Sequence, residues 1–98
     1  MERKECLSKN EAANKSVIAV LVKGVYDFNE YEISKLKVKE MTEVIYDLAV
    51  INKISINKIN SFFTDIRYGK YGMIYRAPSD LIAKFYKYSE TSRTKLAM

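Results

Sequence analysis

Apolar residues recur along most of the chain at intervals of three and four positions, the spacing of one face of an α-helix. The clearest stripe predicts a helix over residues 35–52 and consists of Met41, Val44, Ile45, Leu48, Ala49 and Ile51. A second stripe predicts a helix over 56–68 and consists of Ile56, Ile59, Phe62, Phe63 and Ile66. A third predicts a helix beginning near Pro78, with Leu81, Ile82 and Phe85 inward and Tyr86 as a further candidate.

The N-terminal apolar segment fits two structures. The continuous, β-branched run Val17–Val22 is typical of a buried strand. No second strand-like run exists to pair with it, however, and an isolated strand leaves its backbone groups unsatisfied. We therefore predict a helix over residues 9–25, opened by a capping box of Ser8 and Glu11. Its expected buried residues are Ala13, Val17, Val20 and Leu21, with Val25 as a further candidate.

Capping residues mark the other helix ends. Ser34, Ser55 and Ser79 are predicted N-caps, and Asp80 would interact favourably with the dipole of the last helix. Gly69 lies where a glycine ends a helix in the left-handed conformation.

The chain contains one proline and three glycines and shows no low-complexity linker or internal repeat. Sparse helix breakers favour long helices, and 98 residues suit one domain. We therefore predict an all-α fold, a small compact bundle of about four amphipathic helices spanning residues 1–98. Residues 1–8 and 92–98 are candidates for a mobile leader and tail.

The residue inventory argues against catalysis. Histidine is absent and Cys6 is the single cysteine, so the commonest general base and the commonest zinc ligands are missing. Glu40, Glu43 and Asp47 share one helix face, but nearby lysines make a solvated salt-bridge face the simpler interpretation. We expect a protein without enzymatic activity, cofactor or metal ion. Without a secretory signal or an apolar run that could span a bilayer, we expect a cytoplasmic location and no membrane partner.

The formal charge is +5, and its excess lies toward the C-terminus. The positive residues beyond position 63 are Arg67, Lys70, Arg76, Lys84, Lys87, Arg93 and Lys95, and the negative ones are Asp65, Asp80 and Glu90. This asymmetry is compatible with a polyanionic partner, and it is also compatible with an ordinary, mildly basic protein.

The segment 62–75 is the most distinctive part of the chain. It contains two of the chain's three glycines and three of its eight tyrosines, interspersed with basic residues. Its spacing does not fit a P-loop, a Rossmann fingerprint or an RNA-recognition strand. Two interpretations remain open: a structural turn with core-packed tyrosines, and an exposed aromatic–basic docking patch. The candidate interaction residues are Arg67, Tyr68, Lys70, Tyr71, Tyr75, Arg76, Lys84 and Lys87.

The order of features over residues 26–82 resembles an uncharacterised family of small helical proteins from phages and mobile elements of Bacteroidota. The matching positions are Asp27, Asn29, Glu30, Tyr31, Ile54, Ile56, Phe63, Gly69, Lys70, Tyr71, Gly72 and Tyr75. The family continues with an acidic residue, a basic residue and an Asp-Gly pair, where this chain has the sequence Arg-Ala-Pro-Ser-Asp at 76–80. The resemblance implies a viral or mobile-element origin and gives no mechanism.

Together these observations predict a non-enzymatic protein that binds and modulates a larger protein or nucleoprotein complex. A replication assembly or an RNA-guided defence effector would be such a complex. The alternative is direct, sequence-independent binding of DNA or RNA by the same surface.

Overall fold

The computed structural model describes the backbone of residues 10–97 and the side chains of residues 10–91. Within that range the fold is all-α, with helices α1 (Glu11–Phe28), α2 (Lys35–Ile51), α3 (Ile56–Arg67) and α4 (Pro78–Ala97) and no strand. The predicted fold class is therefore confirmed, and the run that resembled a strand is part of α1. The expected mobility of residues 92–98 stays a prediction, although the backbone is helical to Ala97.

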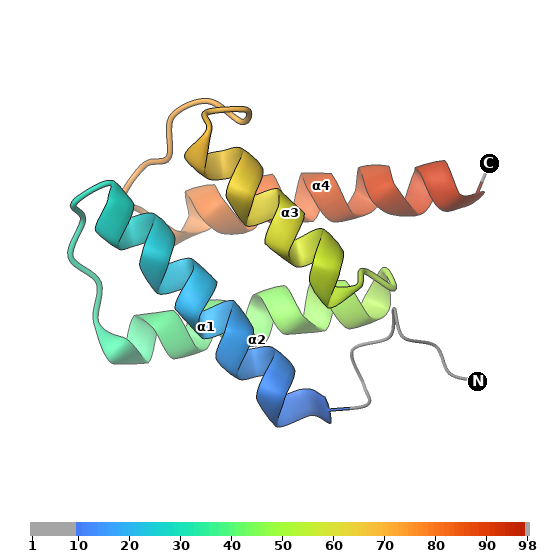
Figure 1. Ribbon diagram of the computed structural model, residues 1–98, viewed down its shortest axis with the longest axis horizontal. Coiled ribbons are helices and arrows are strands. Elements are labelled where there is room, and N and C mark those ends of the chain that lie inside the picture. The colour runs from blue at the N-terminus through green and yellow to red at the C-terminus, as the bar shows by residue number, and fades with distance from the viewer. Residues whose placement is uncertain (1–9, 98) are drawn as a thin grey trace.

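The helices form two crossed layers (Figure 1). Helices α1 and α3 lie in the front layer and contact each other, while α2 and α4 lie behind them and also contact each other. Contacts between α1 and α2 join the layers. The molecule measures 41 × 28 × 19 Å, so it is only two helices thick.

Side-chain caps open the first three helices. The side chains of Asn10, Ser34 and Ser55 accept hydrogen bonds from the backbone N–H groups three residues further on. Ser34 and Ser55 are thus confirmed as caps. The cap of α1 is Asn10, whereas the proposed Ser8 lies outside the described residues.

Helix α4 begins near Pro78 as predicted, but its N-cap is not the predicted one. Pro78 is its first residue, so Ser79 lies within the first turn and is not the N-cap. Proline suits this position because the missing N–H would have no partner inside the helix and the fixed φ is already helical.

The first three helices end in the same Schellman motif, in which a left-handed residue follows the C-cap. That residue is Glu30 (φ 60°) after α1, Lys53 (φ 57°) after α2 and Gly69 (φ 82°) after α3. The N–H of the next residue in each case bonds to a carbonyl of the last helical turn, at 2.8–3.0 Å. The predicted role of Gly69 is confirmed. At the first two ends the C-cap is Asn29 or Asn52, whose side-chain amide donates back to the helix.

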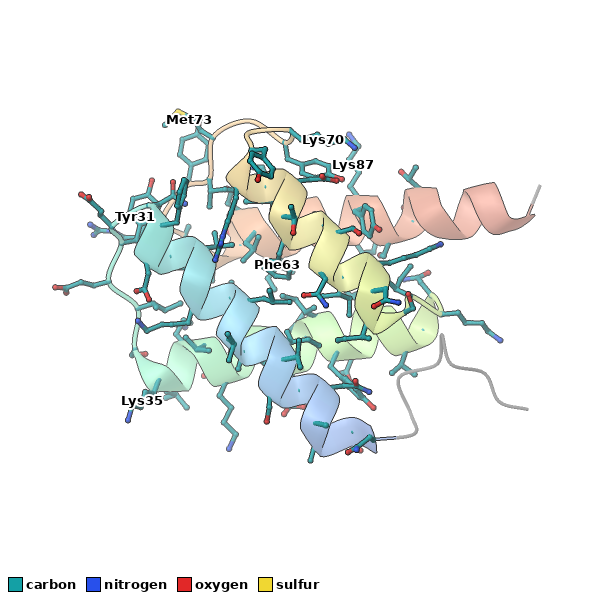
Figure 2. The ribbon with its side chains drawn as sticks, viewed as in Figure 1. Tyr31, Lys35, Phe63, Lys70, Met73 and Lys87 are labelled. Atoms are coloured by element: carbon teal, nitrogen blue, oxygen red, sulfur yellow. The ribbon has the colours of Figure 1, made fainter. Side chains whose placement is uncertain are left out.

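Aromatic rings fill the centre of the core. Phe62 is fully buried, and its ring centroid lies 5.1–5.3 Å from the centroids of four other rings. These rings belong to Phe63, Tyr71, Phe85 and Tyr88. Phe63 is buried as well, near the middle of the view in Figure 2. The apolar stripe predicted for α3 is thus the inward face of that helix, with Ile56 only partly buried.

The buried face of α1 differs from the predicted one. The buried residues are Ile18, Val22, Val25 and Tyr26, whereas Ala13 and Val17 are exposed and Val20 is 70% exposed. The segment is apolar on more than one side, so its periodicity alone does not select a face. Burial of Ile18 and the Tyr26 ring removes more apolar area from water than burial of Ala13 and Val20 would. Leu21 and the candidate Val25 are the predicted positions that do contact the core.

Two positions of the α2 stripe also face outward. Val44 is exposed and Ile51 is 67% exposed, while Thr42 and Tyr46 are buried in their place. Met41, Ile45 and Ala49 are buried as predicted, and Leu48 is partly buried. In α4, Leu81 and Phe85 are buried and Ile82 is partly buried, but Tyr86 is exposed.

Candidate docking surface

The connection between α3 and α4, residues 68–77, presents apolar side chains to solvent from a fixed backbone. Exposure alternates from residue to residue in its central stretch. Ile74 points inward and is buried. Its neighbours Met73 and Tyr75 point outward and are 68% and 56% exposed. The buried isoleucine thus holds the two exposed residues in defined positions.

Two tyrosine hydroxyls hold the same stretch. The Tyr31 hydroxyl donates to the carbonyl oxygen of Ile74 at 2.8 Å, and the Tyr26 hydroxyl donates to that of Arg76 at 2.9 Å. The two rings contact each other edge to face, with centroids 6.0 Å apart. Burial raises the pKa of the Tyr26 hydroxyl, and the nearby Asp80 carboxylate and Tyr31 raise it further. Tyr26 therefore stays protonated and able to donate at neutral pH.

Asp80 fixes the end of the loop. Its carboxylate accepts a hydrogen bond from the backbone N–H of Tyr75 at 2.8 Å and pairs with Lys84 at 2.7 Å. Burial alone would raise the pKa of Asp80. The hydrogen bonds from Lys84 and from the Tyr75 N–H outweigh that effect and hold the pKa below its usual value. Asp80 therefore serves as a loop anchor as well as a first-turn acid of α4.

The two glycines and Tyr71 shape the start of the loop. Gly69 and Gly72 both have positive φ, at 82° and 79°. Between them Tyr71 turns inward and packs its half-buried ring on Phe62. Burial raises the pKa of the Tyr71 hydroxyl. Tyr71 consequently packs on the core, as the structural interpretation of this segment predicted, whereas the side chain of Tyr75 is exposed.

The remaining predicted interaction residues divide by environment. Tyr68, the C-cap of α3, is 85% exposed. Lys70 pairs with Asp65 at 3.5 Å and lies near the ring of Tyr71. Figure 2 places Lys70 and Met73 along the upper edge of the molecule.

Arg76 is exposed, and its guanidinium lies 5.9 Å from the centroid of the Tyr31 ring. Lys87 is exposed and forms no ion pair with another described residue.

Two of the predicted residues are oriented toward the protein. The ammonium of Lys84 is mostly buried, paired with Asp80 and 5.8 Å from the centroid of the Tyr75 ring, so it supports the loop from beneath. The guanidinium of Arg67 lies over Gly24 of α1, where an added Cβ would be 2.8 Å from Nη2. Arg67 therefore lies at the seam between α1 and α3.

Sequence reasoning missed four residues of this surface: Tyr26, Tyr31, Met73 and Asp80 in its role as an anchor. Met73 had a signal, because it lies within the segment 62–75, which its glycines and tyrosines already marked as distinctive. The two tyrosine contacts join residues 43 and 50 positions apart, and no local pattern indicates such contacts.

The acidic residues of α2 behave as surface charges. Glu40 pairs with Lys37 at 3.2 Å, as the sequence suggested, and Glu43 pairs with Lys15 of α1 at 2.9 Å. Among the described residues, no three His, Cys, Asp or Glu side chains are grouped as a metal site would require. No helix in the described part of the chain has the length and apolar character needed to cross a membrane.

Comparison with known proteins gives no relative: no family model, no curated protein and no solved structure matches the chain. The resemblance to a family of phages and mobile elements stays a hypothesis that rests on the residues quoted for it.

Proposed function

We propose that this protein is a small, non-enzymatic interaction protein of a phage or mobile element that binds and modulates a larger nucleoprotein complex. The docking surface is the loop 68–77 with the adjoining face of α4. The observation that carries the proposal is the pair of exposed side chains, Met73 and Tyr75, on either side of the buried Ile74. The viral origin comes from the sequence resemblance. The nature of the complex, a replication assembly or an RNA-guided defence effector, comes from the general expectation that small non-enzymatic viral proteins act by binding a larger machine that handles nucleic acid.

Rigidity favours this surface as a binding site. Exposed apolar side chains on a mobile loop must be ordered when a partner binds, and that ordering costs free energy. Here two tyrosine hydroxyls, Asp80 and Ile74 already hold the loop. Tyrosine and arginine dominate the binding energy of many interfaces, and Tyr75 and Arg76 stand next to each other at the edge of this loop.

The charges of the surface favour a protein partner over nucleic acid. Lys70 and Lys84 are paired with Asp65 and Asp80, so the charges of these two lysines are already balanced within the protein and attract phosphates less. The exposed thioether of Met73 suits an apolar pocket in a protein. Direct nucleic-acid binding remains the second candidate because the exposed rings of Tyr68 and Tyr75 could stack on bases.

The test compares two matched double variants in quantitative pull-downs from host lysate, read by mass spectrometry. Met73→Ser/Tyr75→Ser removes the apolar part of the loop surface. Val20→Ser/Ile51→Ser removes two equally exposed apolar side chains elsewhere, on α1 and α2. We expect the loop variant to lose its specific partner and the control to keep it, with both proteins folded. Equal retention by the two variants would contradict the proposal.

Charge reversal supplies a second test. Lys70→Glu/Arg76→Glu changes exposed side chains, which usually alters stability by no more than about 0.5 kcal/mol each. We expect partner capture to be lost while the melting temperature stays nearly constant. Full capture by this folded variant would place the interface elsewhere on the molecule.

Fluorescence anisotropy with duplex DNA, single-stranded DNA and RNA separates the two candidate functions. Phosphate contacts are strongest at low salt, because each one releases a counterion. Binding at roughly 50 mM salt that weakens steeply as salt rises would favour the nucleic-acid function. Absence of binding under those conditions would eliminate it.

A further inference from the structure

A groove runs between α1 and α2, away from the loop surface. It encloses about 440 Å³ and has an apolar floor with a basic rim. Its lining residues are Lys15, Ser16, Ala19, Lys23, Lys35, Val38, Lys39, Thr42 and Glu43. In Figure 2, Lys35 lies at the lower left and Lys70 and Met73 lie along the upper edge, so the two surfaces can be tested separately.

The groove lies between residues 15–23 of α1 and residues 35–43 of α2. Lys15 of α1 contacts Glu43 of α2 at one end. Beyond Lys23, at the other end, lies a second hollow of about 560 Å³, whose lining includes the carboxylates of Asp27 and Glu32 and which is not part of the basic groove. On α1 the groove spans Lys15 to Lys23, which is eight residues of helix, or about 12 Å, and matches roughly two turns of another helix.

The charges around the groove are not balanced equally. Lys15 pairs with both Glu11 and Glu43, and Lys23 pairs with Asp27. Lys35 and Lys39 form no ion pair with another described residue. They lie four positions apart on α2 and therefore on the same side of that helix. Among residues 10–91, the α2 wall thus carries two cations with no counter-charge of their own.

We propose that this groove binds an acidic amphipathic helix of a partner protein. The apolar side of that helix packs against Ala19 and Val38, and its carboxylates pair with Lys35 and Lys39. An amphipathic helix in a groove between two helices is a common mode of peptide recognition. The charges set the preference for an acidic partner, and the apolar floor favours a helix over bare phosphates. The proposal does not rest on the function of the loop surface.

The probe is a designed 14-residue peptide, stapled in a helical conformation, with leucines on one face and glutamates flanking them. A second peptide of the same design carries lysines in place of the glutamates. Isotope-labelled protein is titrated with each peptide and followed by NMR, and fluorescence anisotropy gives the affinities. We expect the acidic peptide to bind, with chemical-shift changes over residues 15–23 and 35–43, and the basic peptide to bind at least about tenfold more weakly.

Two variants and a control complete the test. Lys35→Glu/Lys39→Glu should weaken the acidic peptide at least about tenfold and reverse the preference between the peptides. Ala19→Phe fills the floor of the groove and should block the binding of both peptides. The control Lys53→Glu/Lys58→Glu makes the same charge change outside the groove and outside the loop surface, and it should bind like the wild-type protein.

The proposal is wrong if the acidic peptide shows no saturable binding or if the two peptides bind equally well. It is also wrong if the chemical-shift changes are confined to residues 68–77, or if the Lys53→Glu/Lys58→Glu control loses as much affinity for the acidic peptide as Lys35→Glu/Lys39→Glu does. Sedimentation with phosphatidylglycerol vesicles and anisotropy with single-stranded DNA are run in parallel. If Lys35→Glu/Lys39→Glu abolishes binding to either of these but leaves peptide binding intact, the groove binds an anionic lipid or nucleic acid and the proposal is wrong. Partner capture by the loop is measured on the same variants, so failure of one surface is distinguishable from failure of the other.

Discussion

Replacing Tyr31 by phenylalanine tests whether the tyrosine hydroxyls hold the docking loop. The substitution keeps the ring and removes only the O–H group that donates to Ile74 at 2.8 Å. A typical intramolecular hydrogen bond contributes about 0.5–1.5 kcal/mol, and an acceptor left without a donor inside the protein costs about 1–3 kcal/mol. Tyr31 is only partly buried, so water can replace part of the lost bond. We expect a loss of about 1 kcal/mol, which lowers the melting temperature by about 4–8 °C in a domain of this size.

Tyr26→Phe should cost more, about 1–2 kcal/mol, because Tyr26 is almost fully buried and water reaches the Arg76 carbonyl less easily. Since both hydroxyls hold the same short stretch, the two losses should not be additive, and a double-mutant cycle should give a coupling of about 0.5 kcal/mol or more. Denaturant unfolding measures the three variants, and amide hydrogen exchange reports local opening of residues 72–76.

Tyr88→Phe is the matched control. Its hydroxyl donates to the Lys58 carbonyl of α3 at 3.2 Å, which is the same chemistry on a carbonyl outside residues 72–76. It should lower stability without a selective increase of exchange at residues 72–76. If Tyr31→Phe changed stability by less than a few tenths of a kcal/mol, or if the control raised exchange in the loop equally, the hydroxyl contacts would not be what fixes this surface.

Three further predictions concern the core, a helix end and pH. Phe63→Ala should cost about 3–5 kcal/mol, a large share of the stability of a small domain, and circular dichroism melts will measure it. Lys53→Gly should stabilise the protein by about 0.5–1 kcal/mol in urea unfolding, because relief of the left-handed conformation outweighs the added freedom of the unfolded chain; a loss would refute this. Asp80 has a lowered pKa in the folded protein, so it stabilises the fold above its unfolded pKa of about 3.9, and this contribution disappears as pH falls through the folded pKa. The stability difference between wild type and Asp80→Asn should therefore shrink in unfolding curves below about pH 4, and a constant difference would contradict the assignment.

The fold class could be predicted from the sequence because three-and-four spacing and capping residues are local signals. Helices α2 and α3 begin after Ser34 and Ser55 as expected, and α3 ends before Gly69 as expected. The hydrogen bonds of these three residues lie within one helical turn, so local sequence is enough to predict them. The buried face of α1 could not be predicted in the same way. Val17, Ile18, Val20 and Val22 are all apolar, and only the position of the neighbouring helices decides which of them is buried.

The candidate site shows the same division between local and distant contacts. The sequence indicated a tyrosine-rich, basic loop, and the glycine conformations that shape it follow from local geometry. It did not indicate that Lys84 would be paired beneath the loop, that Arg67 would lie over α1, or that Tyr31 would bond to Ile74. The Arg67 and Tyr31 contacts depend on how α1 meets α3 and the loop in three dimensions. The Lys84–Asp80 pair, by contrast, lies within one turn of α4, and its spacing of four residues was a local signal that sequence reasoning did not use.

The residues that carry the family resemblance have structural roles in this protein. Asn29, Glu30 and Tyr31 form the end of α1, and the Tyr31 hydroxyl holds the loop. Gly69 and Gly72 provide positive φ, and Tyr71 packs on the core. These positions specify how the helices end and how the loop is held, so a protein that shares them is expected to share the loop conformation.

Met73 and Lys87, by contrast, are exposed and anchor no part of the fold among the described contacts. Substitutions at such positions are expected to change the partner at little cost in stability. The choice of partner would then depend on the exposed residues of a loop whose shape is set by buried ones. The serine variants at Met73 and Tyr75 and the phenylalanine variants at Tyr26 and Tyr31 separate these two contributions experimentally.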